Sequence, residues 1–160
     1  MADLQLIDSL AKLLKRDGAV AAMTTIDAEG HAATVLNAEV FLTPHGTFLY
    51  REYLESSTTN RNLLHALWFE KRAILAVAAG EKALDVHGVP TIAHVAGPLF
   101  QEHYAAAQAA DPETDLATVW EIRIDDIVEV SPGFLRRRQD AERPFFRHLD
   151  RLLVPAPQQR

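Results

Sequence analysis

The chain has 160 residues, of which 48% are hydrophobic, and its formal net charge is −6 at pH 7. This length and apolar content predict one globular domain with a substantial core. The negative charge argues against nucleic-acid binding, because no excess of cations is available to displace phosphate counterions. The absence of cysteine excludes thiolate metal sites and cysteine nucleophiles. We therefore expect a small-molecule ligand.

The longest apolar run, residues 73–80, is far too short to span a bilayer. The N-terminus does not combine a basic region, an apolar segment and a small-residue cleavage site. We expect a cytoplasmic protein that has no membrane partner.

The first half of the chain predicts a helix followed by strands. Apolar residues at helical spacing run from Leu4 to Leu14 and stop at Gly18. We then predict a hairpin, formed by a short apolar strand (19–26), an acidic turn that ends in glycine (27–30) and one long strand (31–43). Alternation in the long strand predicts one shared face for Ala32, Leu36, Ala38, Val40 and Leu42, with Asn37 and Glu39 opposite.

A third strand (47–53) places Leu49, Arg51 and Tyr53 on one side. A helix follows, with i,i+4 apolar pairs that include Leu64 and Trp68. Residues 72–79 predict a strand buried on both faces, and 81–97 predict a strand broken at residues 88–90. Both tryptophans, Trp68 and Trp120, are predicted to be core residues.

Proline opens a predicted helix at 98–110, and residues 118–130 form the last predicted strand. Its inward residues are predicted to be Trp120, Ile122, Ile124, Val128 and Val130, and Asp126 is out of phase with them. A basic tail (134–160), helical from Asp140 to Leu153, follows a main domain of residues 1–133. Six strand-like segments with inserted helices favour a mainly β, α+β fold or a small barrel over a doubly wound parallel sheet.

The segment before the second helix is rich in hydroxyl groups, at residues 56–59. One hydroxyl can cap the helix. Alternatively, the hydroxyls and the exposed N–H groups of the helix can converge on a phosphate, with Arg51 or Arg61 supplying positive charge. The two interpretations are compatible, since one hydroxyl can cap while the others bind.

The seven histidines show no HExxH motif, and no two of them share a helical face, so we predict no metal site. Motifs of hydrolases, Rossmann enzymes and P-loop NTPases are also missing. The arginines of the tail alternate with acidic residues, which favours a solvated helix over a surface for RNA or lipid.

Three stretches in order carry a family resemblance: LLKRDGAVAAMTTIDAEGHAATVLNAEVFL, GTFLYREYLESSTTNRNL and HVAGPLF. Together they resemble the FMN-binding split-barrel superfamily, typified by pyridoxamine 5′-phosphate oxidase and small bacterial FMN-binding proteins. The resemblance spans about Lys12 to Val130. It implies a six-stranded antiparallel split β-barrel with flanking helices, and a homodimer that binds FMN at the subunit interface.

The resemblance also implies where the cofactor contacts fall. The residues expected to contact the flavin ring are Val35, Leu36, Asn37, Ala38, Tyr50 and Arg51. The residues expected to bind the phosphate are Ser57, Thr58, Thr59 and Asn62. Trp120 and Arg123 are expected to join the site from the partner subunit. Many relatives carry a cation where this chain has Ser57 and Thr58, so Arg51 or Arg61 has to meet the phosphate charge.

The C-terminal segment of true pyridoxamine phosphate oxidases is poorly matched, which argues against vitamin B6 oxidation. The leading hypothesis is an FMN-dependent oxidoreductase that acts on a small molecule; its catalytic residues are not identified. The alternatives are a non-catalytic FMN binder or electron carrier, a haem-binding split barrel with a ligand such as His94, and a barrel that has lost its cofactor.

Overall fold

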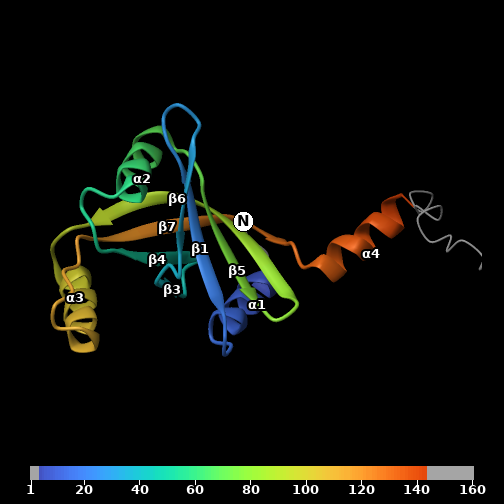
Figure 1. The fold of residues 1–160 in the computed structure, drawn as a ribbon, viewed down its shortest axis with the longest axis horizontal. Coiled ribbons are helices and arrows are strands. Elements are labelled where there is room, and N and C mark those ends of the chain that lie inside the picture. The colour runs from blue at the N-terminus through green and yellow to red at the C-terminus, as the bar shows by residue number, and fades with distance from the viewer. Residues whose placement is uncertain (1–3, 144–160) are drawn as a thin grey trace, which may run out of the picture.

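The structure is a computed structural model and describes residues 4–143. Within this range the chain forms four helices and seven strands (Figure 1). The helices are α1 (Leu4–Leu14), α2 (Thr58–Phe69), α3 (Pro98–Ala110) and α4 (Pro132–Glu142). The strands are β1 (Val20–Ile26), β2 (Ala32–Leu36), β3 (Val40–Leu42), β4 (Thr47–Glu52), β5 (Ala73–Ala79), β6 (Lys82–His94) and β7 (Thr118–Glu129). No helix in this part of the chain has the length and apolar character that a membrane crossing requires.

All seven strands join one antiparallel sheet in the order β2-β1-β5-β6-β7-β4-β3. Because β2 and β3 are consecutive in the chain but lie at opposite edges, the sheet has to curl. The segment between them bonds to both sides: Ala38 N–H donates to Ala21 O at 2.9 Å, and Arg51 N–H donates to Glu39 O at 3.1 Å. The predicted split barrel is confirmed, with seven strands in place of six.

The extra strand comes from a kink at Asn37. This residue has φ of 55°, in the left-handed region that asparagine tolerates better than most residues. The kink reverses the side-chain alternation, because Leu36 is 70% exposed whereas Ala38 is buried. The prediction of one continuous strand over 31–43, with a single inward face, was therefore wrong.

Strand β6 runs through residues 88–90 without a break, contrary to the prediction. Its register against β7 shifts after His87 and after Pro90, so the irregularity is absorbed by bulges. A Cβ atom at Gly88 would lie 2.6 Å from Ile122 Cγ2 and 2.9 Å from Arg123 O. Glycine is needed here because the β7 backbone comes this close.

The bulge also changes which β7 side chains face inward. Gly88 pairs with Ile124 and His87 pairs with Asp126, which leaves Asp125 without a partner across β6. Trp120, Ile122 and Ile124 are buried as predicted. Because Asp125 is an extra residue in β7, the alternation shifts by one position after it, and Ile127 is buried. The prediction that Val128 faces inward was therefore wrong.

Two further burial predictions were wrong. Strand β5 alternates between buried and more exposed residues, so only its inner face is buried. Helix α2 buries Thr59, Asn62, Leu63 and Ala66, which turns Leu64 and Trp68 outward. Trp68 is consequently 76% exposed.

The molecule has two apolar cores. The main core fills the inside of the barrel, and helices α1 and α2 contribute Leu10, Leu13 and Leu63 to it. A smaller core packs α3 against the outer face of β4 and β7. On the outer face of β1 and β2, by contrast, Val20, Ile26 and Leu36 remain 47%, 45% and 70% exposed.

The predicted helices at 4–14 and 98–110 match α1 and α3. Residues 140–142 of the helix expected from Asp140 to Leu153 are helical, as the end of α4, which begins earlier, at Pro132; the expectation for residues 144–153 lies outside the described residues.

Candidate cofactor site

The start of α2 combines a helix cap with a cation. Ser57 is the N-cap residue, and its Oγ accepts a hydrogen bond from the Asn60 N–H at 2.9 Å. Arg61 Nη2 donates to Thr58 Oγ1 at 3.3 Å, and both side chains are exposed. The first turn also presents the N–H group of the exposed Thr58, which has no acceptor within the helix. The cap prediction is confirmed, and the residues that remain fit an anion.

Buried side chains fix this helix start to the sheet. Asn62, 4% exposed, donates through Nδ2 to Thr25 Oγ1 of β1 at 3.1 Å. Trp120 of β7 donates through Nε1 to Asn60 Oδ1 at 2.9 Å. Thr59 is also buried. Asn60 and Asn62 therefore orient α2 through these bonds, and Thr58 and Arg61 remain on the surface.

Trp120 is 1% exposed, so almost none of its indole is accessible to a second subunit. The expected contact between Trp120 and a flavin of the partner subunit does not fit this burial. Its position in the core does match the prediction, and its role in this structure is to hold Asn60. Arg123 is exposed on β7 and bonds to Asp125 two residues away.

The residues expected beside the ring gather at the kink between β2 and β3. Val35 is half-buried and Leu36 is exposed, and Asn37 and Ala38 belong to the segment that bridges β1 and β4. Tyr50 faces the opposite way, into the barrel, where its hydroxyl donates to Glu52 Oε2 at 3.2 Å. Burial, with Glu52 close by, raises the pKa of Tyr50 well above its usual value.

Arg51 belongs to a compact cluster against α3. Its Nε donates to His103 Nδ1 at 3.0 Å and its Nη1 donates to Glu39 Oε2 at 3.1 Å. The guanidinium also lies 4.5 Å from the centroid of the Phe41 ring. Tyr53 donates its hydroxyl to the same Glu39 oxygen at 2.6 Å. Of the two cations named from the sequence, Arg61 is the one that contacts the hydroxyl-rich segment.

This environment sets the protonation of His103. Burial, followed by the positive charge of Arg51, lowers the pKa of the imidazole. Because Nδ1 accepts from Arg51, the neutral ring carries its proton on Nε2. For Tyr53, burial and then the hydrogen bond to Glu39 raise the pKa of the phenol.

Sequence reasoning missed three members of this cluster: Glu39, Tyr53 and His103. Alternation along the third strand did place Tyr53 on the same side as Arg51, which could have suggested a polar cluster on that face. His103 lies 52 residues beyond Arg51, on a helix whose position against β4 no local pattern reveals. The predicted site residues thus fall into a group at the start of α2 and a group at the kink, and Arg123 lies apart from both.

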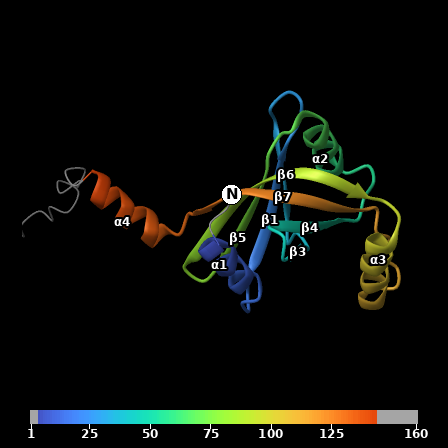
Figure 2. The ribbon, with the colours of Figure 1, turned by 180° about the vertical axis from the view of Figure 1, so that it is seen from behind.

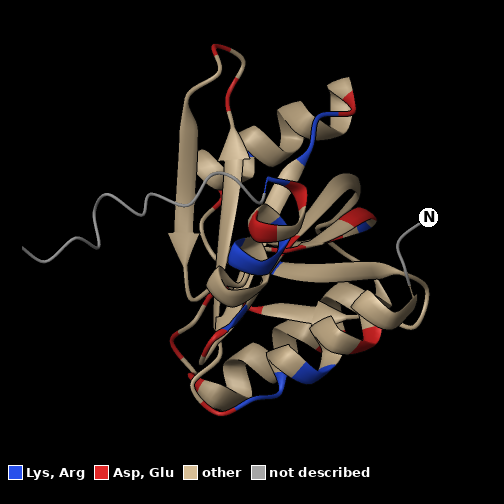
Figure 3. Ribbon diagram, turned by 90° about the vertical axis from the view of Figure 1, so that its right-hand side faces the viewer, with Lys and Arg blue, Asp and Glu red and all other residues tan. Residues whose placement is uncertain are grey.

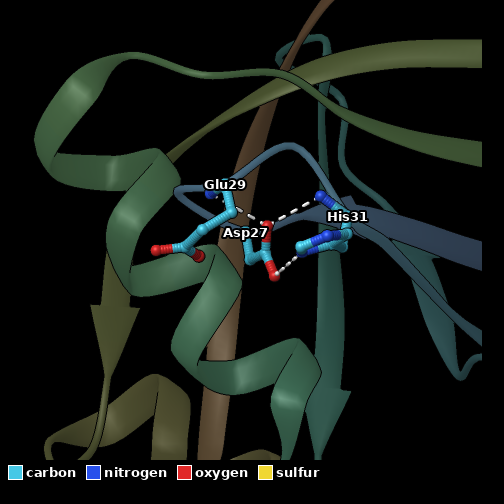
Figure 4. Close-up of side chains that lie close together, drawn as sticks. All are labelled: Asp27, Glu29 and His31. Carbon is cyan, nitrogen blue, oxygen red and sulfur yellow. Dashed lines mark hydrogen bonds and ion pairs between the residues drawn. The ribbon is translucent and has the colours of Figure 1, made fainter.

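The turn between β1 and β2 holds Asp27, Glu29 and His31, and their ligand atoms lie within 4.8 Å of one another (Figure 4). Asp27 Oδ1 accepts from the Glu29 and His31 N–H groups at 3.0 and 2.7 Å, and its Oδ2 lies 3.1 Å from His31 Nδ1. The hydrogen bond from the His31 backbone N–H is the largest cause of the lowered pKa of the Asp27 carboxyl. These contacts close the β1–β2 hairpin turn, which explains why the three residues lie close together.

His94, the residue named for the haem alternative, lies at the end of β6. Its Nε2 is 3.2 Å from Glu121 Oε2, and the side chain is mostly buried. One of the two ring nitrogens is therefore already engaged with a carboxylate.

No protein-family model and no curated protein matches this sequence. Solved structures do match it. An FMN-binding protein from Syntrophomonas wolfei has a TM-score of 0.67 at 13% identity, covering 81% of this chain and 88% of its own. HupZ of Group A Streptococcus has a TM-score of 0.61 at 17% identity, covering 82% and 96%. An F420 reductase has a TM-score of 0.56 at 12% identity, covering 73% and 94%. These likenesses confirm the resemblance at the level of the fold: the chain is a split barrel of the type that these proteins share.

Proposed function

We propose that this protein is an FMN-binding flavoprotein that acts as an oxidoreductase on a small molecule. The observation that carries the proposal is the start of α2, where the exposed side chains of Arg61 and Thr58 meet at the helix N-terminus on the surface of a split barrel. FMN presents a phosphate with close to two negative charges, which suits a guanidinium, a hydroxyl and a helix N-terminus. When bound, FMN would supply the hydride or electron transfer itself.

In this proposal Arg61 and Thr58 hold the phosphate, and the buried bonds from Asn62 and Trp120 keep α2 in place. Thr25, the acceptor for Asn62, pairs with Ala33, two residues before Val35 on β2. This short path from the helix start to the kink supports a single pocket, with the phosphate at one end and the ring at the other. Leu36 would cover one face of the ring.

The proposal includes a homodimer. Neighbouring strands align small and apolar side chains on the outer face of the sheet: Leu36 pairs with Ala22, which pairs with Ala76. Val20 and Ala78 form a parallel row beside them. A second copy that covers this face would bury apolar surface on both subunits, and the small side chains would let the two sheets approach closely.

The direct test is an absorbance spectrum of the freshly purified protein, followed by titration of the colourless form with FMN. Flavin bands are expected. Arg61→Ala should weaken FMN binding roughly tenfold to hundredfold, the range for loss of a charged hydrogen bond. Lys12→Ala, which removes an exposed cation on α1, is the control and should leave the affinity unchanged. Protein that is colourless and takes up no FMN would refute the proposal.

The same preparation separates an enzyme from a passive carrier. An oxidoreductase should turn over a reductant such as NAD(P)H or a small-molecule substrate under steady-state conditions. A carrier would be reduced by a partner protein without such turnover. A Soret band in place of flavin bands would favour haem.

A further inference from the structure

Helix α4 stands away from the rest of the molecule. In Figures 1 and 2 it projects from one end of the barrel, while α3 lies at the opposite end. None of its residues is buried. An isolated helix shorter than about 12–15 residues is marginal in water, because its stability normally comes from packing one face against a partner. The structure therefore presents a helix that still needs a surface to pack on.

The base of this helix is fixed. Ser131, 5% exposed, accepts a hydrogen bond at Oγ from the Ala83 N–H at 3.0 Å, and the same hydroxyl donates to Glu129 Oε1 at 3.0 Å. Pro132 then occupies the first turn of α4, where its restricted φ suits a helix start. The helix thus leaves the body from an anchored point, in a defined direction.

Helix α4 carries three consecutive arginines, Arg136, Arg137 and Arg138, followed by Asp140 and Glu142 near its C-terminal end. Arg138 pairs with Glu142 at 3.3 Å, one turn away. Within residues 4–143, neither Arg136 nor Arg137 forms an ion pair with an acidic side chain. Figure 3 shows α4 with this basic segment next to its acidic end.

A cavity of about 610 Å³ lies at the other end of the molecule, beside α3. Leu54, Ala107 and Ala110 give it apolar walls, and Asp111, Glu113 and Asp115 line it with carboxylates. None of these three carboxylates forms an ion pair in the described part of the chain. The one cation in the lining, Arg51, is already engaged by Glu39 and His103.

We infer that α4 of one subunit docks in this acidic cavity of a second copy of the chain, and that the second copy docks its own α4 reciprocally. The charges are complementary, because, within the described residues, the two arginines of α4 without an acidic partner, Arg136 and Arg137, would meet three unpaired carboxylates. Because α3 and α4 lie at opposite ends, a two-fold axis through the middle of the pair brings each α4 to the partner's cavity.

This inference rests on the dimer of the proposed function but not on its cofactor. Cross-linking tests it sharply, because the chain contains no cysteine of its own. One chain carries Arg137→Cys and another carries Asp115→Cys, and the two are mixed and oxidised. A disulfide-linked pair of chains is expected. Replacing Asp115→Cys by Glu29→Cys, at the exposed β1–β2 turn, is the matched control and should give little cross-linking.

A chain with both Arg137→Cys and Asp115→Cys tests the reciprocity. A closed two-fold pair yields a covalent dimer, whereas head-to-tail docking would yield a ladder of longer species. Such a ladder, or equal cross-linking with the Glu29→Cys control, would overturn the inference.

Charge reversal provides a second measurement, by sedimentation of the full chain. Arg136→Glu with Arg137→Glu should weaken self-association by about tenfold at low salt, as should Glu113→Lys with Asp115→Lys. A mixture of the two double variants should recover the association through mixed dimers, because in a mixed pair opposite charges face each other at both contacts. Dimers unaffected by either double variant would refute the docking while leaving FMN binding, read from absorbance, untouched. Conversely, cross-linking in protein that binds no FMN would refute only the flavin proposal.

Discussion

Arg51 Nε donates a hydrogen bond to His103 Nδ1 at 3.0 Å, which ties strand β4 to helix α3 through a neutral imidazole. Burial of the ring, followed by the charge of Arg51 next to it, lowers the pKa of His103. Protonation of His103 would put two positive charges side by side and remove the acceptor for Arg51. The contact between β4 and α3 is therefore sensitive to acid.

The first prediction concerns this sensitivity. Below the ordinary imidazole pKa of 6.5, the unfolded chain binds a proton at His103 that the folded chain does not. The free energy of unfolding should therefore fall as the pH drops below 6.5, until the lowered pKa of the folded state is passed. Urea titrations across this range measure it. In His103→Gln the slope should flatten, while His45→Gln, in an exposed turn, should keep the slope of the parent.

A second prediction addresses Arg51 itself. Its side chain is only 10% exposed and contacts Glu39, His103 and Phe41. Arg51→Ala should lower the free energy of unfolding by roughly 1–3 kcal/mol, because the buried imidazole of His103 loses its donor and the packing against Phe41 is lost. Arg123→Ala removes an exposed arginine and should cost less than about 0.5 kcal/mol. Equal effects of the two variants on the urea midpoint would contradict the structural role of Arg51.

Two glycines offer a matched pair for the third prediction. A methyl group at Gly88 meets Ile122 Cγ2 at 2.6 Å and a β7 carbonyl at 2.9 Å, so Gly88→Ala should destabilise the barrel by about 1–3 kcal/mol. Gly133, in the first turn of α4, has its nearest contact at 3.5 Å, so Gly133→Ala should be tolerated. Thermal midpoints distinguish them, and an unchanged midpoint for Gly88→Ala would show that the two strands are further apart than described.

The fourth prediction uses the two tryptophans as probes. Trp68→Phe should remove the long-wavelength, iodide-quenchable part of the fluorescence with little change in stability, because Trp68 is 76% exposed. Trp120→Phe should cost roughly 1–3 kcal/mol, since it deletes core volume and the hydrogen bond to Asn60. Quenching of the Trp120 emission by iodide in the folded protein would contradict its burial.

Regular periodicity predicted much of the fold, since α1, α3, the shared face of Leu49 and Arg51 on β4 and the inner face of the first half of β7 follow simple rules of spacing. The failures share a physical cause. The αL residue Asn37 and the bulge at Gly88 each shift the alternation by one position, and neither leaves a mark in a pattern of apolar residues. The sequence predicted a strand break at Gly88, whereas glycine there lets β7 approach closely, and sequence alone does not reveal such a packing contact.

Burial on α2 was misassigned for a different reason. Thr59 and Asn62 are polar residues on the buried face, and they satisfy their hydrogen-bonding groups inside the protein, whereas Leu64 and Trp68 face outward. A hydrophobic stripe was therefore a poor guide to the side that packs. The hydroxyl-rich segment was recognised as a cap and anion site, but the choice between Arg51 and Arg61 depended on tertiary contacts across 52 residues.

The kink between β2 and β3 has a consequence for the tolerance of this chain to insertions. Three residues, 37–39, carry the chain from one edge of the sheet to the other while bonding to both sides. One additional residue there would have to be accommodated as a further bulge or by a one-position slip of β2 or β3, and such a slip would turn every side chain of that strand to the opposite face. Length in this link is therefore expected to be under tighter constraint than length in the β1–β2 or β3–β4 turns, which close on themselves and can grow outward into solvent.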